Sequence, residues 1–126
     1  MRTSLARNDV TESAIRGTCH CGTVEIVLAT FPSTITECNC SLCRRYGVLW
    51  AYVEADQVLE LPDPGLTDAY AWNGQNVDFL RCRDCGCITH WVPRKKGRTS
   101  RGINARIFDP ELVAQSKRIF RDGANK

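Results

Sequence analysis

The sequence lacks any long apolar segment. Its longest apolar run, Val48 to Val53, is far shorter than the roughly 18 residues that a membrane-spanning helix needs, so a membrane protein is not expected. The first 17 residues also contain no apolar stretch that resembles the core of a secretory signal. Together these two absences predict a cytoplasmic location.

A strong excess of one charge is missing as well. The chain has 17 basic and 14 acidic residues, and the resulting net charge of +3 is too small to indicate nucleic acid as a partner. It has no internal repeat and no low-complexity segment. With 126 residues, 43% of them apolar and 25% charged, we expect one globular domain over residues 14–126, preceded by a flexible arm over residues 1–13.

Short stretches of alternating apolar and polar residues predict a mainly β domain of antiparallel strands with one or two short helices. The clearest signal is a hairpin in which Asn73 and Gly74 join strands over residues 67–72 and 77–82. Asp109 followed by Pro110 indicates the start of a helix that runs to about Gln115. The remaining predicted elements are a strand over 24–28 with its partner over 35–39, a helical turn over 41–46, a central buried strand over 48–54, and strands over 88–92, 102–108 and 117–121.

Eight cysteines in a reducing compartment indicate metal ligands rather than disulfides. Two groups have the form of zinc knuckles, in which two sulfurs face one ion and a glycine follows: Cys19-His20-Cys21-Gly22 and Cys82-Arg83-Asp84-Cys85-Gly86. Four thiolates complete a closed tetrahedron, so Cys19, Cys21, Cys82 and Cys85 are predicted to hold a structural zinc. Disulfide bonding is the alternative, although Cys19 and Cys21 are too close in sequence to bridge each other easily.

A second group, Cys38, Cys40 and Cys43, supplies three sulfurs within one loop. Structural zinc sites fill all four positions with protein, whereas reactive sites keep one position open. A zinc ion on these three sulfurs could capture an incoming thiol and hold it as a nucleophilic thiolate. Three alternatives stay open: Cys87 closes a second structural site, the three cysteines form a redox disulfide, or they are free thiols.

The three motifs in this order resemble the glutathione-dependent formaldehyde-activating enzyme family, also called the centromere protein V family. The resemblance spans about residues 17–110 and implies an Mss4-like fold, a small twisted β tent. It implies that Cys19, Cys21, Cys82 and Cys85 hold the structural zinc, and that Cys38, Cys40 and Cys43 hold a second, more labile zinc. The implied activity is of the carbon-sulfur lyase type: the reversible addition of glutathione to formaldehyde, which gives S-(hydroxymethyl)glutathione.

Candidate substrate-binding residues lie close to the second cysteine group or on later strands. Arg44 and Arg45 follow it directly, and a guanidinium suits a carboxylate, of which glutathione has two; a solvated pair is the alternative. Trp50, which shares a strand face with Tyr52, could wall a pocket or belong to the core. Asn104 and Arg106 would point the same way from one strand, towards the cleft or towards water.

A basic cluster suggests a second class of function. Five positive charges fall within eight residues: Arg94, Lys95, Lys96, Arg98 and Arg101. Most such runs are solvated loops, but the cluster leaves open a non-catalytic zinc module that binds a protein or nucleic acid. The leading hypothesis is an enzyme whose partners are a small thiol such as glutathione and an aldehyde, working as a monomer or homodimer.

Overall fold

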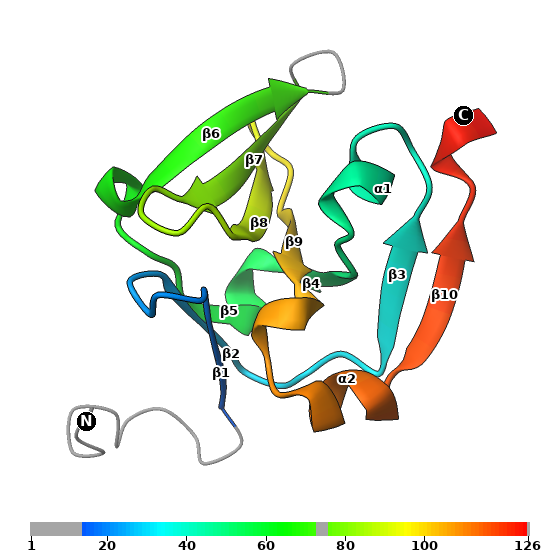
Figure 1. Ribbon diagram of the computed structural model, residues 1–126, viewed down its shortest axis with the longest axis horizontal. Helices are drawn as coiled ribbons and strands as arrows, with labels where there is room; N and C mark the ends of the chain where they lie inside the picture. Colours follow the sequence, from blue (N-terminus) through cyan, green and yellow to red (C-terminus); the bar gives the residue numbers. More distant parts are fainter. Residues whose placement is uncertain (1–13, 73–75, 126) are drawn as a thin grey trace.

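Two β-sheets make up most of the computed structural model, which describes residues 14–72 and 76–125 (Figure 1). The smaller sheet has the strand order β1-β2-β5, and the larger has the order β10-β3-β4-β9-β8-β7-β6. The strands are β1 (Ile15–Thr18), β2 (Glu25–Leu28), β3 (Thr34–Cys38), β4 (Trp50–Glu54), β5 (Val58–Glu60), β6 (Thr67–Trp72), β7 (Val77–Cys82), β8 (Ile88–Pro93), β9 (Ser100–Asn104) and β10 (Lys117–Arg121). This architecture confirms the predicted mainly β class.

Two short helices, α1 (Cys43–Tyr46) and α2 (Pro110–Gln115), complete the regular structure together with a few 3-10 turns. Asp109 begins α2 as expected, because its carboxylate accepts a hydrogen bond from the Glu111 backbone N–H at 2.9 Å and Pro110 occupies the first turn. In the ranges that the structure describes, no helix has both the length and the apolar composition to cross a bilayer.

The main apolar core lies between the two sheets. Ile26 and Leu28 of β2 belong to one buried cluster with Ala51 and Val53 of β4 and Ile103 of β9. Burying an Ile or Leu side chain contributes about 1.5–3 kcal/mol to the stability of a fold. The predicted central strand is indeed interior to the larger sheet, between β3 and β9, but only one of its faces is fully buried, because Tyr52 is 40% exposed.

The predicted hairpin is confirmed. β6 and β7 pair in antiparallel register along their whole length, from Thr67 opposite Cys82 to Trp72 opposite Val77. The expected turn at Asn73-Gly74 lies outside the described residues, as does the expected arm over residues 1–13. The domain boundary at residue 14 stays a prediction.

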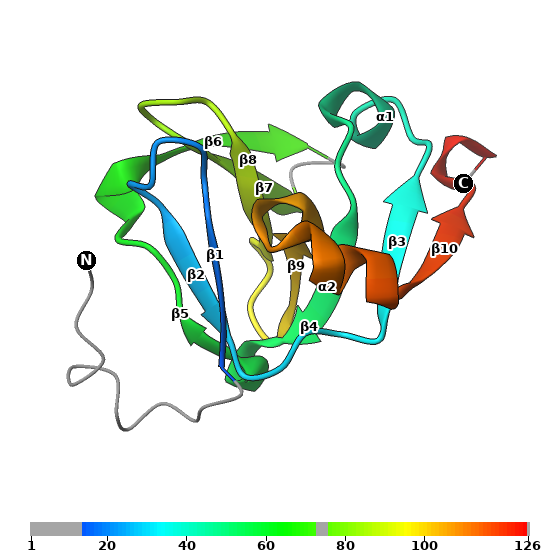
Figure 2. The ribbon, with the colours of Figure 1, turned by 60° about the horizontal axis from the view of Figure 1, so that its bottom comes forward.

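The predicted pairing of the strand over residues 24–28 with the strand over residues 35–39 is wrong. β2 lies between β1 and β5, while β3 pairs with β4 and, in parallel, with β10. Figure 2 shows α2 beside the starting ends of both β3 and β10. Two hydrogen bonds hold those ends together: Ser116 Oγ donates to the Pro32 carbonyl at 2.7 Å, and the Lys117 N–H donates to the Ser33 carbonyl at 2.8 Å. Because both strands start from the same end, the larger sheet is mixed rather than wholly antiparallel.

The predicted strand over residues 102–108 is shorter than expected. β9 ends at Asn104, and Ala105–Ile107 form a 3-10 turn. The Asn104 side chain causes this change of structure, since its Oδ1 accepts a hydrogen bond from the Arg106 N–H at 3.0 Å, as a helix-capping residue does. Asn104 and Arg106 therefore do not share a strand face.

Gly102 gives a test of how tightly the larger sheet is packed. It lies opposite Trp91 in the β8–β9 pairing, and a Cβ atom at this position would overlap the indole ring. We expect Gly102→Ala to lower the free energy of unfolding by about 1–3 kcal/mol, the usual cost of overpacking. Gly65→Ala is the matched control, because its Cβ would approach nothing closer than 3.6 Å. Equal chemical denaturation midpoints for the two variants would contradict this packing.

His90 gives a test of the pH dependence of stability. Burial, and secondly the charge of Arg101, lower the pKa of this imidazole from 6.5 to about 4. Between pH 6.5 and pH 4 the unfolded chain binds a proton at this imidazole, whereas the folded chain does not. The free energy of unfolding therefore has its full value above pH 6.5 and falls as the pH is lowered towards 4. The loss amounts to about 3 kcal/mol.

The measurement compares the unfolding free energies of the wild type and His90→Gln at several pH values. Other groups titrate in both proteins, so their difference isolates the histidine. We expect this difference to change by about 3 kcal/mol between pH 6.5 and 4. A difference that stays constant over this range would contradict the account.

Candidate functional site

Four cysteines from the two predicted knuckles meet at one end of the molecule. Cys19 and Cys21 follow β1, Cys82 ends β7, and Cys85 lies in the next turn. Their four sulfur atoms lie within 4.8 Å of one another, and we call them the quartet. The Sγ atoms of Cys19 and Cys21, and those of Cys21 and Cys82, are each 3.6 Å apart.

The quartet fits a metal ion. Four thiolates arranged in a tetrahedron around one ion, at about 2.3 Å from it, lie about 3.8 Å from each other, close to the observed separations. Backbone N–H groups point at these sulfurs: Val24 donates to Cys19 at 3.3 Å, and Asp84 donates to Cys82 at 3.4 Å. Backbone hydrogen bonds from Cys87 and Cys21 lower the pKa of the Cys85 thiol to about 5, which favours the thiolate that a metal requires.

The glycines that follow each pair allow the backbone to turn. Gly22 and Gly86 have φ angles of 85° and 81°, in the left-handed region that glycine adopts without strain. This conformation brings the two sulfurs of each knuckle to the same side of its turn.

A second cluster, which we call the trio, consists of Cys38, Cys40 and Cys43. Cys38 ends β3 and Cys43 begins α1, so the loop between these elements carries all three sulfurs within 4.8 Å of one another. The Cys43 N–H donates to Cys40 Sγ at 3.3 Å, and the indole Nε1–H of Trp50 donates to Cys43 Sγ at 3.3 Å. Burial raises the pKa of the Cys43 thiol to about 12, so this group has a proton to release when a metal binds.

Cys87 does not complete the trio. It packs beside the quartet, in the apolar cluster of Cys19, Val24 and Cys82. None of the eight cysteines forms a disulfide in the structure. Among the described residues, no fourth cysteine, histidine or carboxylate joins the trio.

The C-terminal segment crosses the trio loop, a feature that the sequence analysis missed. Asn39 binds it three times: its N–H donates to the Arg121 carbonyl at 3.2 Å, its Nδ2 donates to Asp122 Oδ1 at 2.9 Å, and its Oδ1 accepts from the Ala124 N–H at 2.9 Å. Gly123 approaches so closely that a Cβ there would lie 2.7 Å from Cys38 Sγ. The end of β10 therefore forms part of the site.

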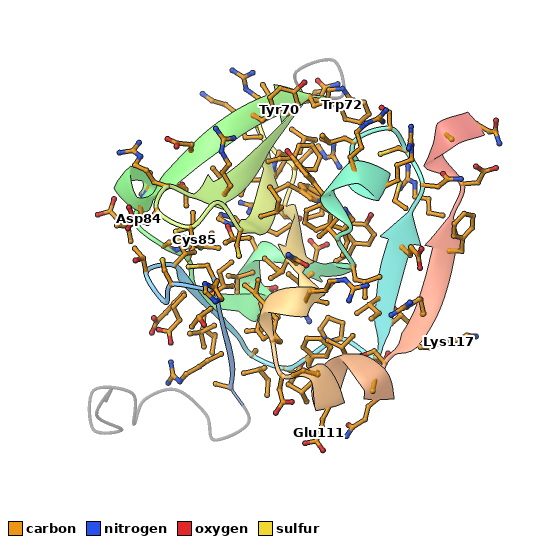
Figure 3. All side chains as sticks on the ribbon, in the orientation of Figure 1. Tyr70, Trp72, Asp84, Cys85, Glu111 and Lys117 are labelled. Carbon is orange, nitrogen blue, oxygen red and sulfur yellow. The ribbon has the colours of Figure 1, made fainter. Side chains whose placement is uncertain are left out.

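The trio opens into a cavity of about 510 Å³. Five aromatic side chains line it: Trp50, Tyr52, Trp72, Phe79 and Trp91. Arg98, Ser100 and Arg121 are its polar lining residues besides the cysteines and Tyr52. Cys85 and Trp72 lie towards opposite ends of the β6–β7 hairpin (Figure 3), so the quartet and the cavity are separate parts of the molecule.

Of the predicted substrate-binding residues, only Trp50 lines the cavity. Arg45 donates from Nη1 to the Ser41 carbonyl at 2.7 Å, and Arg44 is exposed on α1. Asn104 Nδ2 donates to the Ile88 carbonyl at 2.7 Å, and Arg106 Nε donates to the Gly47 carbonyl at 3.0 Å. These contacts give Arg45, Asn104 and Arg106 structural partners. Substrate binding by any of the five predicted residues, Trp50 included, stays a prediction.

The basic cluster is divided between several environments. Arg94 lies 3.6 Å from Asp78 as an ion pair, and Arg101 donates to the Ser100 carbonyl at 2.9 Å. Arg98 lines the cavity, while Lys95 and Lys96 are exposed. The sequence contained a signal for Arg98 in this cluster, but it did not indicate which of the five charges would reach the site.

Two comparisons with known proteins agree with this geometry. A family model described as glutathione-dependent formaldehyde-activating enzyme matches residues 14–122. The crystal structure of a Rhodobacter sphaeroides protein is similar with a TM-score of 0.65 and 26% sequence identity, covering 83% of this chain and 100% of that one.

Two cysteine substitutions test the different roles of the clusters. We expect Cys82→Ser to abolish cooperative thermal unfolding, because the quartet joins distant segments and metal binding of this kind contributes about 10–16 kcal/mol in small peptides. Cys38→Ser should lose one equivalent of metal by elemental analysis but keep a cooperative transition, because the trio lies within one loop. Equal effects of the two changes on unfolding would contradict this division.

Proposed function

Because the chain belongs to the glutathione-dependent formaldehyde-activating enzyme family, we propose that it is a zinc-dependent enzyme of the carbon-sulfur lyase type. Its reaction is the reversible addition of glutathione, or of another small thiol, to formaldehyde or a related aldehyde. The observation that carries this proposal is the trio, whose three converging sulfurs face a cavity rather than a fourth protein ligand.

The donor sets of both clusters suit zinc. Thiolates are ligands that zinc prefers, and the sulfur separations in the quartet match a closed tetrahedral site. We assign a structural zinc to Cys19, Cys21, Cys82 and Cys85, and a second, more labile zinc to Cys38, Cys40 and Cys43. Zinc bound at the trio supplies a Lewis acid that lowers the pKa of a nearby thiol.

The chain's own residues provide the surroundings for the addition. The carbon–sulfur bond forms as the carbonyl π bond breaks, and the oxygen becomes a hydroxyl by taking the proton that the thiol gave up. Trp50 and Phe79 are 1% and 6% exposed, so they exclude water from one wall of the cavity. Arg98 and Arg121 offer positive charge to a substrate carboxylate.

The alternative function, a non-catalytic module that binds protein or nucleic acid, depended on the basic cluster. Arg94 forms an ion pair with Asp78, and Arg98 lines the cavity. This dispersal of the charges favours the thiol function. A cytoplasmic location and a monomeric or homodimeric state stay predictions.

Exchange NMR with isotopically labelled formaldehyde and glutathione tests the proposed function. We expect the wild type to accelerate interconversion of the free thiol and the hydroxymethyl adduct, and Cys40→Ser to lose at least about tenfold of this acceleration while keeping its unfolding transition. Cys87→Ser, a cysteine outside both clusters, is the matched control and should retain it. Unchanged exchange in a folded Cys40→Ser protein would refute the proposal.

A further inference from the structure

The cavity beside the trio has mainly aromatic walls. All three tryptophans of the chain, Trp50, Trp72 and Trp91, line it together with Tyr52 and Phe79. The rings of Trp50 and Phe79 have centroids 5.9 Å apart, and those of Tyr52 and Trp91 are 6.1 Å apart. These rings come from four different strands of the larger sheet, β4, β6, β7 and β8, so the fold itself gathers them. Such walls favour a flat apolar group that stacks on them.

The polar groups of the cavity are a poor match for glutathione. That tripeptide carries an ammonium group, two carboxylates and two amides, and each needs a partner when it leaves water. No Asp or Glu occurs among the described residues that line the cavity, so the ammonium group has no carboxylate to meet. The Trp50 N–H already donates to Cys43 Sγ. Ser100 and Tyr52 are the remaining hydroxyl groups.

The charges of the lining favour an acidic substrate. Arg98, from the segment between β8 and β9, and Arg121, at the end of β10, both face the cavity. Neither forms an ion pair with a described residue, whereas Arg94 and Arg118 are paired with Asp78 and Glu37 at 3.6 Å. A guanidinium without a carboxylate partner is suited to bind one from a ligand.

We propose that the thiol which this cavity takes is a small aromatic molecule that carries a carboxylate, rather than glutathione. This inference rests on the proposed function and specifies its substrate class. The aromatic group lies among the tryptophan, tyrosine and phenylalanine rings, the carboxylate meets Arg98 or Arg121, and the sulfur reaches the trio. The volume of about 510 Å³ is within the usual range for a site that encloses a molecule of this kind.

Intrinsic fluorescence gives a direct binding assay, since every tryptophan of the chain lines the cavity. Purified protein with its metal is titrated with 2-sulfanyl-3-phenylpropanoate and with four analogues. 2-Sulfanylpropanoate lacks the ring, 2-phenylethanethiol lacks the carboxylate, and 2-hydroxy-3-phenylpropanoate lacks the thiol; glutathione is the fourth. We expect the first compound to bind at least about tenfold more tightly than each of the others.

Substitutions of the arginines test the carboxylate contact. Arg98→Gln and Arg121→Gln should each weaken binding of 2-sulfanyl-3-phenylpropanoate, with a combined loss of about tenfold, and leave 2-phenylethanethiol unaffected. Lys96→Gln and Arg118→Gln are the matched controls, because each removes one positive charge from the same segment without lining the cavity. An equal loss for both compounds would mean that the arginines only balance the charge of the sulfurs, and would overturn the acidic part of the proposal.

The titrations also separate this inference from the proposed function. Glutathione binding as tightly as the aromatic thiol acid would overturn the inference and leave the thiol function intact. Equal binding of the hydroxy acid and the thiol acid would refute the thiol-handling function and overturn the inference with it, because the sulfur would then make no contact with the trio. The absence of a response to any of the thiols would overturn both.

Discussion

The convergence of four sulfur atoms from two distant segments is the constraint on which the rest of the structure depends. Cys21 and Cys82 are separated by 61 positions in sequence, yet their sulfurs lie 3.6 Å apart. The first knuckle joins β1 to β2 of the smaller sheet, and the second joins β7 to β8 of the larger one. A metal ion held there would fix the relation between the sheets, and with it the main apolar core that lies between them.

The trio differs from the quartet in what surrounds it rather than in the kind of ligand. Its sulfurs belong to one loop, which Asn39 fastens to the C-terminal segment, and they face an aromatic cavity. Because the three sulfurs lie within one loop, loss of one ligand here should not separate the sheets, and this is where the proposed function places its reactive site. The proposed function thus assigns stability and chemistry to two groups of cysteines at different places in the fold.

Local patterns predicted the features that depend on neighbouring residues. Cysteine spacing identified both clusters, Asn73-Gly74 identified the β6–β7 pairing, and Asp109-Pro110 identified the start of α2. What could not be predicted depends on contacts between distant segments. The sequence of β3 does not reveal that its partner is β10, and nothing near Phe79 or Arg121 indicates that they line the same cavity as Cys38. The prediction that Asn104 and Arg106 share a strand face was wrong because the Asn104 side chain caps a 3-10 turn, and the alternation of a strand ends there.

Anomalous X-ray diffraction at the zinc absorption edge, on crystals of the purified protein, tests the central claim most directly. The account predicts one peak enclosed by Cys19, Cys21, Cys82 and Cys85, and a second peak bound by Cys38, Cys40 and Cys43 whose remaining position faces the cavity. A trio that is sealed by a fourth protein ligand, or joined by a disulfide with no metal, would contradict it.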